Sequence, residues 1–481
     1  MASKQRLYDL IDAKGADYAA LSDRIWEHAE TRFEEKQSSA TLVEALKTAG
    51  FAVEEEAGGV PYAFVGTAGA GSPVIGFLGE YDALSGLSQE AGSAESKPII
   101  PGAGGHGCGH NMLGVGSLAA AVALAEYLAE NKLVGTVKYY GCPGEEGGSG
   151  KAFMAREGVF ADLDAAICWH PGTMNATSSG SSLANIQVYY RFTGRASHAA
   201  GSPHLGRSAL DAVELMNVGV NYLREHVIPE ARVHYAVIDT GGKSPNVVQA
   251  NAEVLYLIRA PKNNLVQEIY AWVNDIARGA ALMTQTEVHI EVDKACSNLV
   301  PNETLEKLMQ ANLEAIPALS QTSEEQAFAE AIRSTLGEAE LAKESTSLVH
   351  KYGGQEGRRL AELLVGKALH TAVLPHRTSE QPMMGSTDVS DVSWIVPTVQ
   401  CNTSCYALGT PGHSWQMVAQ GKSSWAHKGM LLAAKAMAAT GLDLFQQPDQ
   451  LTAAKEELKE RLGDEPYRCP IPAGVQPKPV K

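Results

Sequence analysis

The chain lacks the features that would place it in a membrane or in a secretory compartment. Its longest apolar run, residues 113–129, is short for a membrane span, rich in Ala and Gly, and carries Glu126, so we expect a buried helix there. The N-terminus has no apolar core of the kind found in secretion signals. The seven cysteines are scattered, without the short regular spacings of a disulfide scaffold, which favours a reducing compartment. We therefore expect a cytoplasmic protein.

Positive charge is also in short supply. The formal net charge is -16, and no basic patch is interleaved with aromatic residues, so nucleic acid is not an expected partner. Hydrophobic residues at 44% and charged residues at 20% are typical of a globular protein. A chain of 481 residues is too long for one ordinary core, and we expect two or more domains.

The first part of the chain alternates strand and helix patterns. Residues 73–79 form a continuous apolar run, as in a strand buried on both faces. A helix is predicted over residues 112–132, and further strands over 134–142 and 165–169. This order is typical of a doubly wound, mostly parallel α/β sheet, which we assign to a catalytic domain that begins with residues 1–183.

The pattern changes near residue 184. Residues 184–300 follow the order β-α-β-β-α-β, which predicts an inserted ferredoxin-like α+β domain. Residues 301–481 then complete the catalytic domain, with an acidic stretch at 320–346 interpreted as a mobile excursion and a Pro-rich extended tail at the end. At the other end of the chain, residues 5–50 predict two helices.

Titratable side chains follow three strands of the predicted parallel sheet, and two more stand in the loop after the first of these strands. Because the carboxyl ends of parallel strands share one edge, where ligands bind, these groups are expected to converge there. They are Glu80, Asp82, Cys108, His110, Glu145, Glu146 and His170.

Four of these groups, together with His413 in the C-terminal part of the chain, are good ligands for divalent metal ions. Five ligands exceed what one four-coordinate ion takes from a protein, and they suit two ions that share a bridging ligand and a water, as in metal-assisted hydrolysis. Glu145 adjoins one of them and is placed to take a proton from the water and pass it to the leaving amine. The five are Cys108, His110, Glu146, His170 and His413.

An ordinary structural interpretation stays open for each group taken alone. Glu145 and Glu146 could form a solvated surface pair, His170 a satisfied buried histidine, and His413 a turn residue. His106 is interpreted as a loop residue or a group behind the ligands, and His427 as a capping or packing residue. Cys142 and Cys168 are interpreted as core residues of buried strands.

Four motifs carry a resemblance to a known family. Cys108 and His110 stand in Gly-Cys-Gly-His, Glu145 and Glu146 in Pro-Gly-Glu-Glu-Gly, and residues 168–171 read Cys-Trp-His-Pro. The fourth, residues 194–200, reads Gly-Arg-Ala-Ser-His-Ala-Ala. Their order and spacing resemble the M20 metallopeptidase family over nearly the whole chain, in particular the aminoacylase and amidohydrolase branch that replaces an aspartate ligand by cysteine.

The resemblance implies a role for each matching residue. The five candidate ligands match the metal ligands of the family, Glu145 its general acid/base, and Asp82 an aspartate that orients a ligand. His198 resembles the histidine of the lid domain that stabilises the oxyanion in the site of a partner protomer, which implies a dimer. Asn246 and Arg259 resemble the pair that holds the main-chain carboxylate of the substrate.

The resemblance also implies an activity. We expect a hydrolase that cleaves the amide of p-aminobenzoyl-glutamate; the alternatives are other N-acyl amino acids, amino-acid conjugates or dipeptides, or a non-catalytic subunit of an active partner. Two divalent ions are expected, manganese rather than zinc, in a homodimer or in a heterodimer with a paralogous subunit. The chain departs from many relatives at Glu80, where they have Asp, and at Asn111, where they also have Asp.

Overall fold

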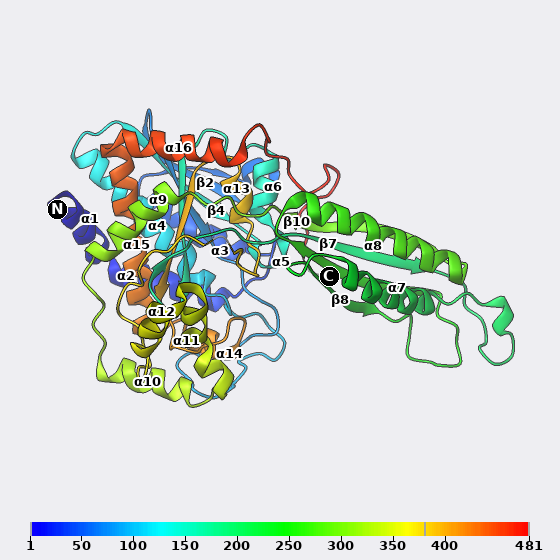
Figure 1. Cartoon of the computed structure of the whole chain (residues 1–481). Helices are drawn as coiled ribbons and strands as arrows, with labels where there is room; N and C mark the ends of the chain where they lie inside the picture. Colours follow the sequence, from blue (N-terminus) through cyan, green and yellow to red (C-terminus); the bar gives the residue numbers. More distant parts are fainter. Residues whose placement is uncertain (1, 380, 480–481) are drawn as a thin grey trace.

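The computed structural model describes residues 2–379 and 381–479. Figure 1 shows a large α/β body from which a long four-stranded arm projects. The N-terminal helix α1 (Ala2–Ala13) lies on the body, at the side away from the arm.

The body is organised around a seven-stranded sheet with the strand order β1-β2-β4-β3-β5-β11-β6. The four central strands β4, β3, β5 and β11 run parallel, and antiparallel strands β1, β2 and β6 complete the edges. This confirms the predicted mixed, mostly parallel α/β sheet. The strands are β1 (Ala52–Glu55), β2 (Phe64–Ala70), β3 (Val74–Glu80), β4 (Gly135–Cys142), β5 (Ala165–Gly172), β6 (Ala176–Thr177) and β11 (Thr398–Ser404).

Helices cover both faces of this sheet, and alternate residues of each strand pack into two separate apolar clusters. Phe77 and Tyr139 belong to the first cluster, with α4 and α15, whereas their neighbours Leu78 and Tyr140 belong to the second, with α6. The helices of the body are α1 (Ala2–Ala13), α2 (Gly15–His28), α3 (Lys36–Thr48), α4 (His110–Glu130), α5 (Glu145–Gly148), α6 (Gly150–Arg156), α9 (Glu303–Ala315), α10 (Ser323–Arg333), α11 (Glu338–Tyr352), α12 (Gly354–Glu362), α13 (Val389–Ser393), α14 (Trp415–Gln420), α15 (Ser424–Gln446) and α16 (Pro448–Leu462).

Helix α4 is apolar on all sides because it packs between the sheet and other helices. Within the described residues it is the one helix long and apolar enough to span a membrane, and 83% of its most apolar window is buried in the body. Burial on every side explains its composition, as expected for a core helix.

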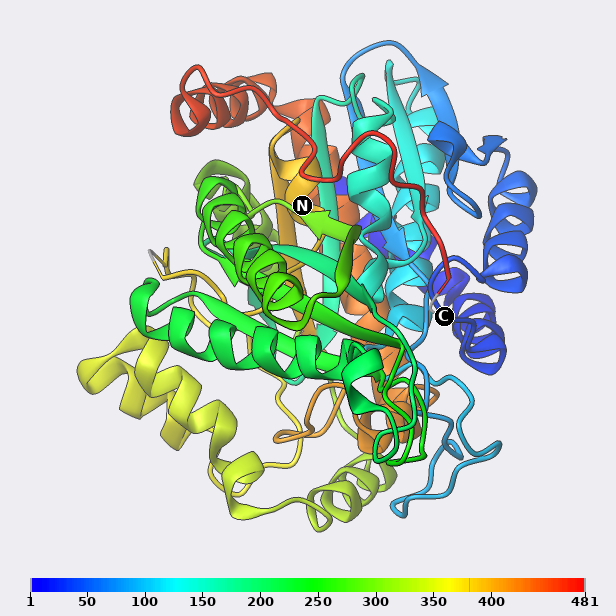
Figure 2. The ribbon, with the colours of Figure 1, turned by 90° about the vertical axis from the view of Figure 1, so that its right-hand side faces the viewer.

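The arm is an inserted domain, built by residues between Ala184 and Cys296 around a four-stranded antiparallel sheet of order β10-β7-β9-β8. Figure 2 shows its two long helices side by side in front of the body. The chain order β7-α7-β8-β9-α8-β10 is the predicted one. The elements are β7 (Ala184–Thr193), α7 (Ala209–Leu223), β8 (Arg232–Asp239), β9 (Asn251–Ala260), α8 (Asn263–Thr284) and β10 (Glu287–Cys296), and 3-10 turns lie at Ala57–Gly59, Pro203–Leu205 and Arg224–His226.

Two expectations about helices are corrected. The N-terminal segment forms three helices, not two, because the chain leaves helical geometry at Lys14 before α2 begins at Gly15. Residues 320–346 form α10 and the start of α11 instead of a mobile excursion. Thr322 begins α10 with a capping box to Glu325, and Ile332 is fully buried.

The C-terminal segment after α16 is extended and runs across the body toward the base of the arm (Figure 2). Arg156 donates to the carbonyls of Pro472 and Val475, and Lys478 forms an ion pair with Glu291 of β10. The tail therefore connects the body to the inserted domain; residues 480–481 lie outside the described part of the chain.

Candidate metal centre

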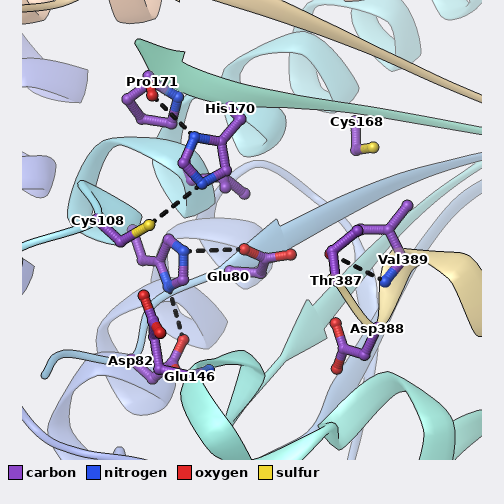
Figure 3. Close-up of polar contacts among 12 residues, drawn as sticks. Glu80, Asp82, Cys108, Glu146, Cys168, His170, Pro171, Thr387, Asp388 and Val389 are labelled. Atoms are coloured by element: carbon purple, nitrogen blue, oxygen red, sulfur yellow. Dashed lines mark hydrogen bonds and ion pairs between the residues drawn. The ribbon is translucent and has the colours of Figure 1, made fainter. Parts of the chain in front are cut away.

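The carboxyl edge of the parallel strands gathers the predicted ligands. β3 ends at Glu80, the turn after β4 carries Glu145 and Glu146, and His170 lies near the end of β5. Cys108 lies in the loop before α4 (Figure 3), and His110 is the first residue of α4. The sheet topology thus brings side chains from distant parts of the sequence to one point.

These side chains form two triads that share one sulfur atom. Ligand atoms of Cys108, His110 and His170 lie within 4.8 Å of one another, and so do those of Cys108, Glu146 and His413. Cys108 Sγ lies 3.3 Å from His170 Nε2, and His413 Nε2 lies 3.2 Å from Glu146 Oε1. The structure therefore brings together all five residues predicted as ligands, and these residues would hold divalent ions with Cys108 common to both triads.

Two buried atoms in this cluster lack hydrogen bonds. His110 Nε2 and Glu146 Oε1 have no partner with hydrogen-bond geometry, although each has an oppositely polarised atom 3.2 Å away. Burial also raises the pKa of the Cys108 thiol, so a cation is needed to hold it as the thiolate. Orphaned nitrogen and oxygen atoms around a buried sulfur are what a divalent transition-metal site requires, and the residues present fit such ions.

Asp82 fixes two of the ligands at once. One of its oxygens lies 2.8 Å from His110 Nδ1, and the other accepts a hydrogen bond of 2.7 Å from the Glu146 backbone N–H. Its contact with Nδ1 leaves Nε2 of His110 directed at the cluster, as partners behind metal-bound histidines do. This placement agrees with the orienting role implied for Asp82.

Glycines shape the loops that carry the ligands. Gly109 has φ +79°, and an added Cβ would lie 2.1 Å from the Tyr406 hydroxyl, so no larger residue fits between Cys108 and His110. Gly144 has φ +63°, packs against the Phe33 ring, and donates its N–H to the buried Glu35 carboxylate at 2.8 Å. The turn before Glu145 is therefore fixed by contacts with Phe33 and Glu35, in the segment between α2 and α3.

Glu145 and Glu146 are neighbours in sequence but differ in electrostatic surroundings. Burial, followed by the charges of Glu80 and Glu146, raises the pKa of Glu145 well above its ordinary value. Burial opposes ionisation of Glu146 too, but the close contact with the His413 imidazole and the charge of His110 outweigh it and lower its pKa to about 2. Two adjacent carboxyls with opposite pKa shifts suit a proton-transfer group beside a permanently ionised ligand.

Two other histidines have ordinary structural partners, as interpreted from sequence. His106 is buried, its Nε2 lies 3.0 Å from the Ile25 carbonyl, and burial lowers its pKa to about 3. His427 pairs with Asp23 at 2.9 Å. Neither belongs to the triads among the described residues.

Comparison with known proteins agrees with this geometry. The sequence matches the family described as Peptidase family M20/M25/M40 over residues 76–440. The chain belongs to the M20 family.

Its relatives within that family include a nearly full-length homologue. It is 51% identical, over 98% of both chains, to the B-type subunit of p-aminobenzoyl-glutamate hydrolase from Escherichia coli K12. It is 28% identical to a mouse Xaa-Arg dipeptidase, over 96% of this chain and 93% of that one. The fold also matches the crystal structure of an aminobenzoyl-glutamate utilization protein from Klebsiella pneumoniae, with a TM-score of 0.59, 16% identity, and coverage of 91% and 98% of the two chains.

Sequence reasoning missed a buried ion cluster beside the metal centre of this M20 protein. Lys151 has no exposed side-chain surface, and its Nζ lies 2.6 Å from Glu80 and 2.7 Å from Asp388. The other oxygen of Glu80 lies 3.2 Å from His110 Nε2, so the departure at this position places an additional carboxylate against a ligand. The sequence feature that could have indicated this buried cluster is the single lysine in the otherwise apolar segment 150–155.

Replacement of Lys151 by methionine is expected to lower the free energy of unfolding by about 3–5 kcal/mol, because two carboxylates would stay buried without their cation. Urea unfolding of the variant and the wild type measures the difference. Lys138→Met is the matched control, since its partner Asp162 is 58% exposed and would stay solvated, so that loss of the pair should cost about 1 kcal/mol or less. Equal losses in both variants would contradict this account of Lys151.

Two predicted site residues lie away from the metal centre within one chain. Arg259, near the end of β9, lines the cavity at the metal centre. Asn251, the first residue of β9, lies roughly 27 Å from Arg259 along the strand, at the far end of the arm. His198 and Asn246 belong to the loops at that distant end, where Ala199 N–H donates to the Asn246 carbonyl. Asn246 and Arg259 therefore do not form a pair within this chain, and His198 does not reach the metal centre of its own chain.

Arg259 does line the cavity at the metal centre. This cavity of about 680 Å³ also contains Cys108, Glu145 and His413 in its wall. Its walls come from both the body and the base of the inserted domain, a common position for a substrate site.

Proposed function

We propose that this M20 protein hydrolyses p-aminobenzoyl-glutamate to p-aminobenzoate and glutamate. The observation that carries the proposal is the pair of triads sharing Cys108 with Glu145 beside them, in a chain 51% identical to the B-type subunit of a p-aminobenzoyl-glutamate hydrolase. A complete ligand set with its proton-transfer carboxylate favours a catalytic role over a non-catalytic one.

The residues of the chain divide the work of amide hydrolysis. Two divalent cations, when bound, would supply Lewis-acid chemistry to the amide carbonyl and to the attacking water. Glu145 takes the proton of the water and then gives it to the leaving amine nitrogen. Asp82 keeps His110 and Glu146 in position throughout, and Arg259 holds a substrate carboxylate.

We propose manganese as the metal, with zinc as the alternative. The ligand set combines one sulfur with nitrogen and oxygen donors. The thiolate favours zinc by its softness, whereas family resemblance favours manganese. Metal analysis of protein purified without added ions, compared with reconstitution by each ion, decides between them.

We further propose a cytoplasmic dimer, either with a second copy or with a paralogous A-type subunit. The name of the Escherichia coli relative implies such a partner, and the A-type chain of that enzyme is 27% identical over 53% of this chain and 60% of its own length. Exposed apolar side chains on the arm support a protein interface: Val218 and Tyr222 on α7, and Tyr235, Val237 and Ile238 on β8.

A substrate panel on metal-reconstituted protein tests the activity. We expect release of p-aminobenzoate from p-aminobenzoyl-glutamate at a kcat/KM at least about tenfold above that for N-acetyl amino acids, indole-acyl conjugates and dipeptides, since each 1.4 kcal/mol of differential binding gives that factor. Preference for another member of the panel would reassign the substrate. Absence of turnover, with both metals bound and the paralogous A-type chain present, would identify a non-catalytic protein.

A further inference from the structure

A second cation lines the cavity beside Arg259. Arg259 lies on β9 and Lys294 on β10, on either side of β7. Asn185 of β7 pairs with Arg259, and Gln187 of β7 pairs with Lys294, so all four side chains share one face at the base of the arm. All four line the cavity that contains the metal ligands.

A β-bulge turns Lys294 toward this cavity. Val292 pairs with Val188 on the face that packs against the helices, but Lys294 pairs with Gln187, so Asp293 is an extra residue in the strand. In a regular strand residues 292 and 294 would share a face; the bulge moves Lys294 to the opposite one. Asp293 instead pairs with the buried Arg32 at 3.1 Å.

Neither cavity cation has a carboxylate partner within 4.0 Å in the described parts of the chain. Lys294 is 6% exposed, and its Nζ donates to Asn185 Oδ1 at 3.0 Å. Arg259 donates to the Ser386 hydroxyl at 2.9 Å. Burial, with the nearby charge of Arg259, lowers the pKa of Lys294, as expected where two cations share a site without an anion.

Cations in the protein interior are normally paired. The buried Lys294 and the half-buried Arg259 at one cavity wall therefore form a site for two anionic groups. We propose that Lys294 binds the side-chain carboxylate of an acidic amino acid, glutamate above all, while Arg259 binds its main-chain carboxylate. This inference rests on the proposed function and assigns the preference for glutamate to a specific residue. A basic side chain in the same position would meet Lys294 with like charge.

Comparison of two substrates in the Lys294→Met variant tests the assignment. We expect kcat/KM for p-aminobenzoyl-glutamate to fall roughly 10- to 100-fold, mainly through KM, because a charge-assisted hydrogen bond is lost. The value for p-aminobenzoyl-glutamine should change less than about threefold, since its side-chain amide carries no charge. Lys294→Arg should retain most of the preference. Lys262→Met, at an exposed lysine of the same domain, is the matched control and should retain wild-type values.

Equal losses on both substrates in Lys294→Met would assign a merely structural role to Lys294 and overturn the proposal. So would wild-type protein that cleaves the glutamine substrate as well as the glutamate one. Wild-type protein that cleaves neither substrate would refute the proposed function. A binding measurement would then still test whether Lys294 binds a carboxylate.

That measurement is calorimetric titration of the wild-type protein with glutarate and with butyrate. We expect the dicarboxylate to bind at least about tenfold more tightly, as one additional charged contact predicts. Similar affinities for the two acids would overturn the assignment, even if the Lys294 variant failed to fold.

Discussion

Replacement of Glu145 by glutamine is expected to lower kcat by about 10²- to 10⁴-fold, because the group that moves the proton from water to the leaving amine is lost. The metal content should stay near that of the wild type, since both triads that share Cys108 stay intact, although Glu145 also lies within 4.8 Å of the ligand atoms of Glu80 and His110. Steady-state kinetics and metal analysis on the same preparation measure both quantities.

The neighbouring residue supplies the control. Glu146→Gln removes a member of the triad with Cys108 and His413, so it should lower metal content as well as activity. An active Glu145→Gln variant, or one that loses its metal as Glu146→Gln does, would refute the role of Glu145 as the proton-transfer group.

Replacement of Cys108 by serine is expected to have the largest effect on metal binding, because both triads share its sulfur. The number of metal ions bound per chain should fall at both sites together. Activity should fall by at least about 100-fold, because loss of a residue that only supports a metal ligand already lowers activity by up to that factor. Titration with metal followed by elemental analysis measures the number of ions retained.

Cys469→Ser is the matched control, as Cys469 is half-buried in the C-terminal segment, its Sγ donates to the Ala152 carbonyl, and it belongs to neither triad. This variant should bind metal as the wild type does. Loss of one ion and full retention of the other in Cys108→Ser would show that the sulfur does not bridge the two sites.

The convergence of the site was predictable because it depends on topology. Alternating strand and helix patterns predict parallel strands, and parallel strands place Glu80, Glu145 and His170 at one edge whatever the details of packing. Cys108 and His110 follow because their loop leaves the same edge. Only the order of elements and the strand ends are needed for this inference.

The supporting residues were not predictable in the same way. Lys151 meets Asp388 across more than two hundred positions of sequence, through packing of α6 against the segment before α13. Glu35 reaches Gly144 from the loop after α2. No local pattern encodes such contacts, because they depend on how the helices are placed over the sheet.

Lys294 shows a different limit of sequence analysis. β10 continues after the bulge to Cys296, so Lys294 lies within the strand. Strict alternation from Val292 would have directed Lys294 to the helix-packed face. Because the bulge shifts the register by one residue, the alternation of the strand pattern could not predict that Lys294 faces the cavity.

The inserted domain leaves and re-enters the body through the start of β7 and the end of β10, which are neighbouring strands. Because both connections lie at the base of the arm, any rotation of the arm about them would displace His198, at the far end, much more than Lys294 and Arg259, at the base. The two cavity cations would therefore keep their place beside the metal centre whatever the orientation of the arm.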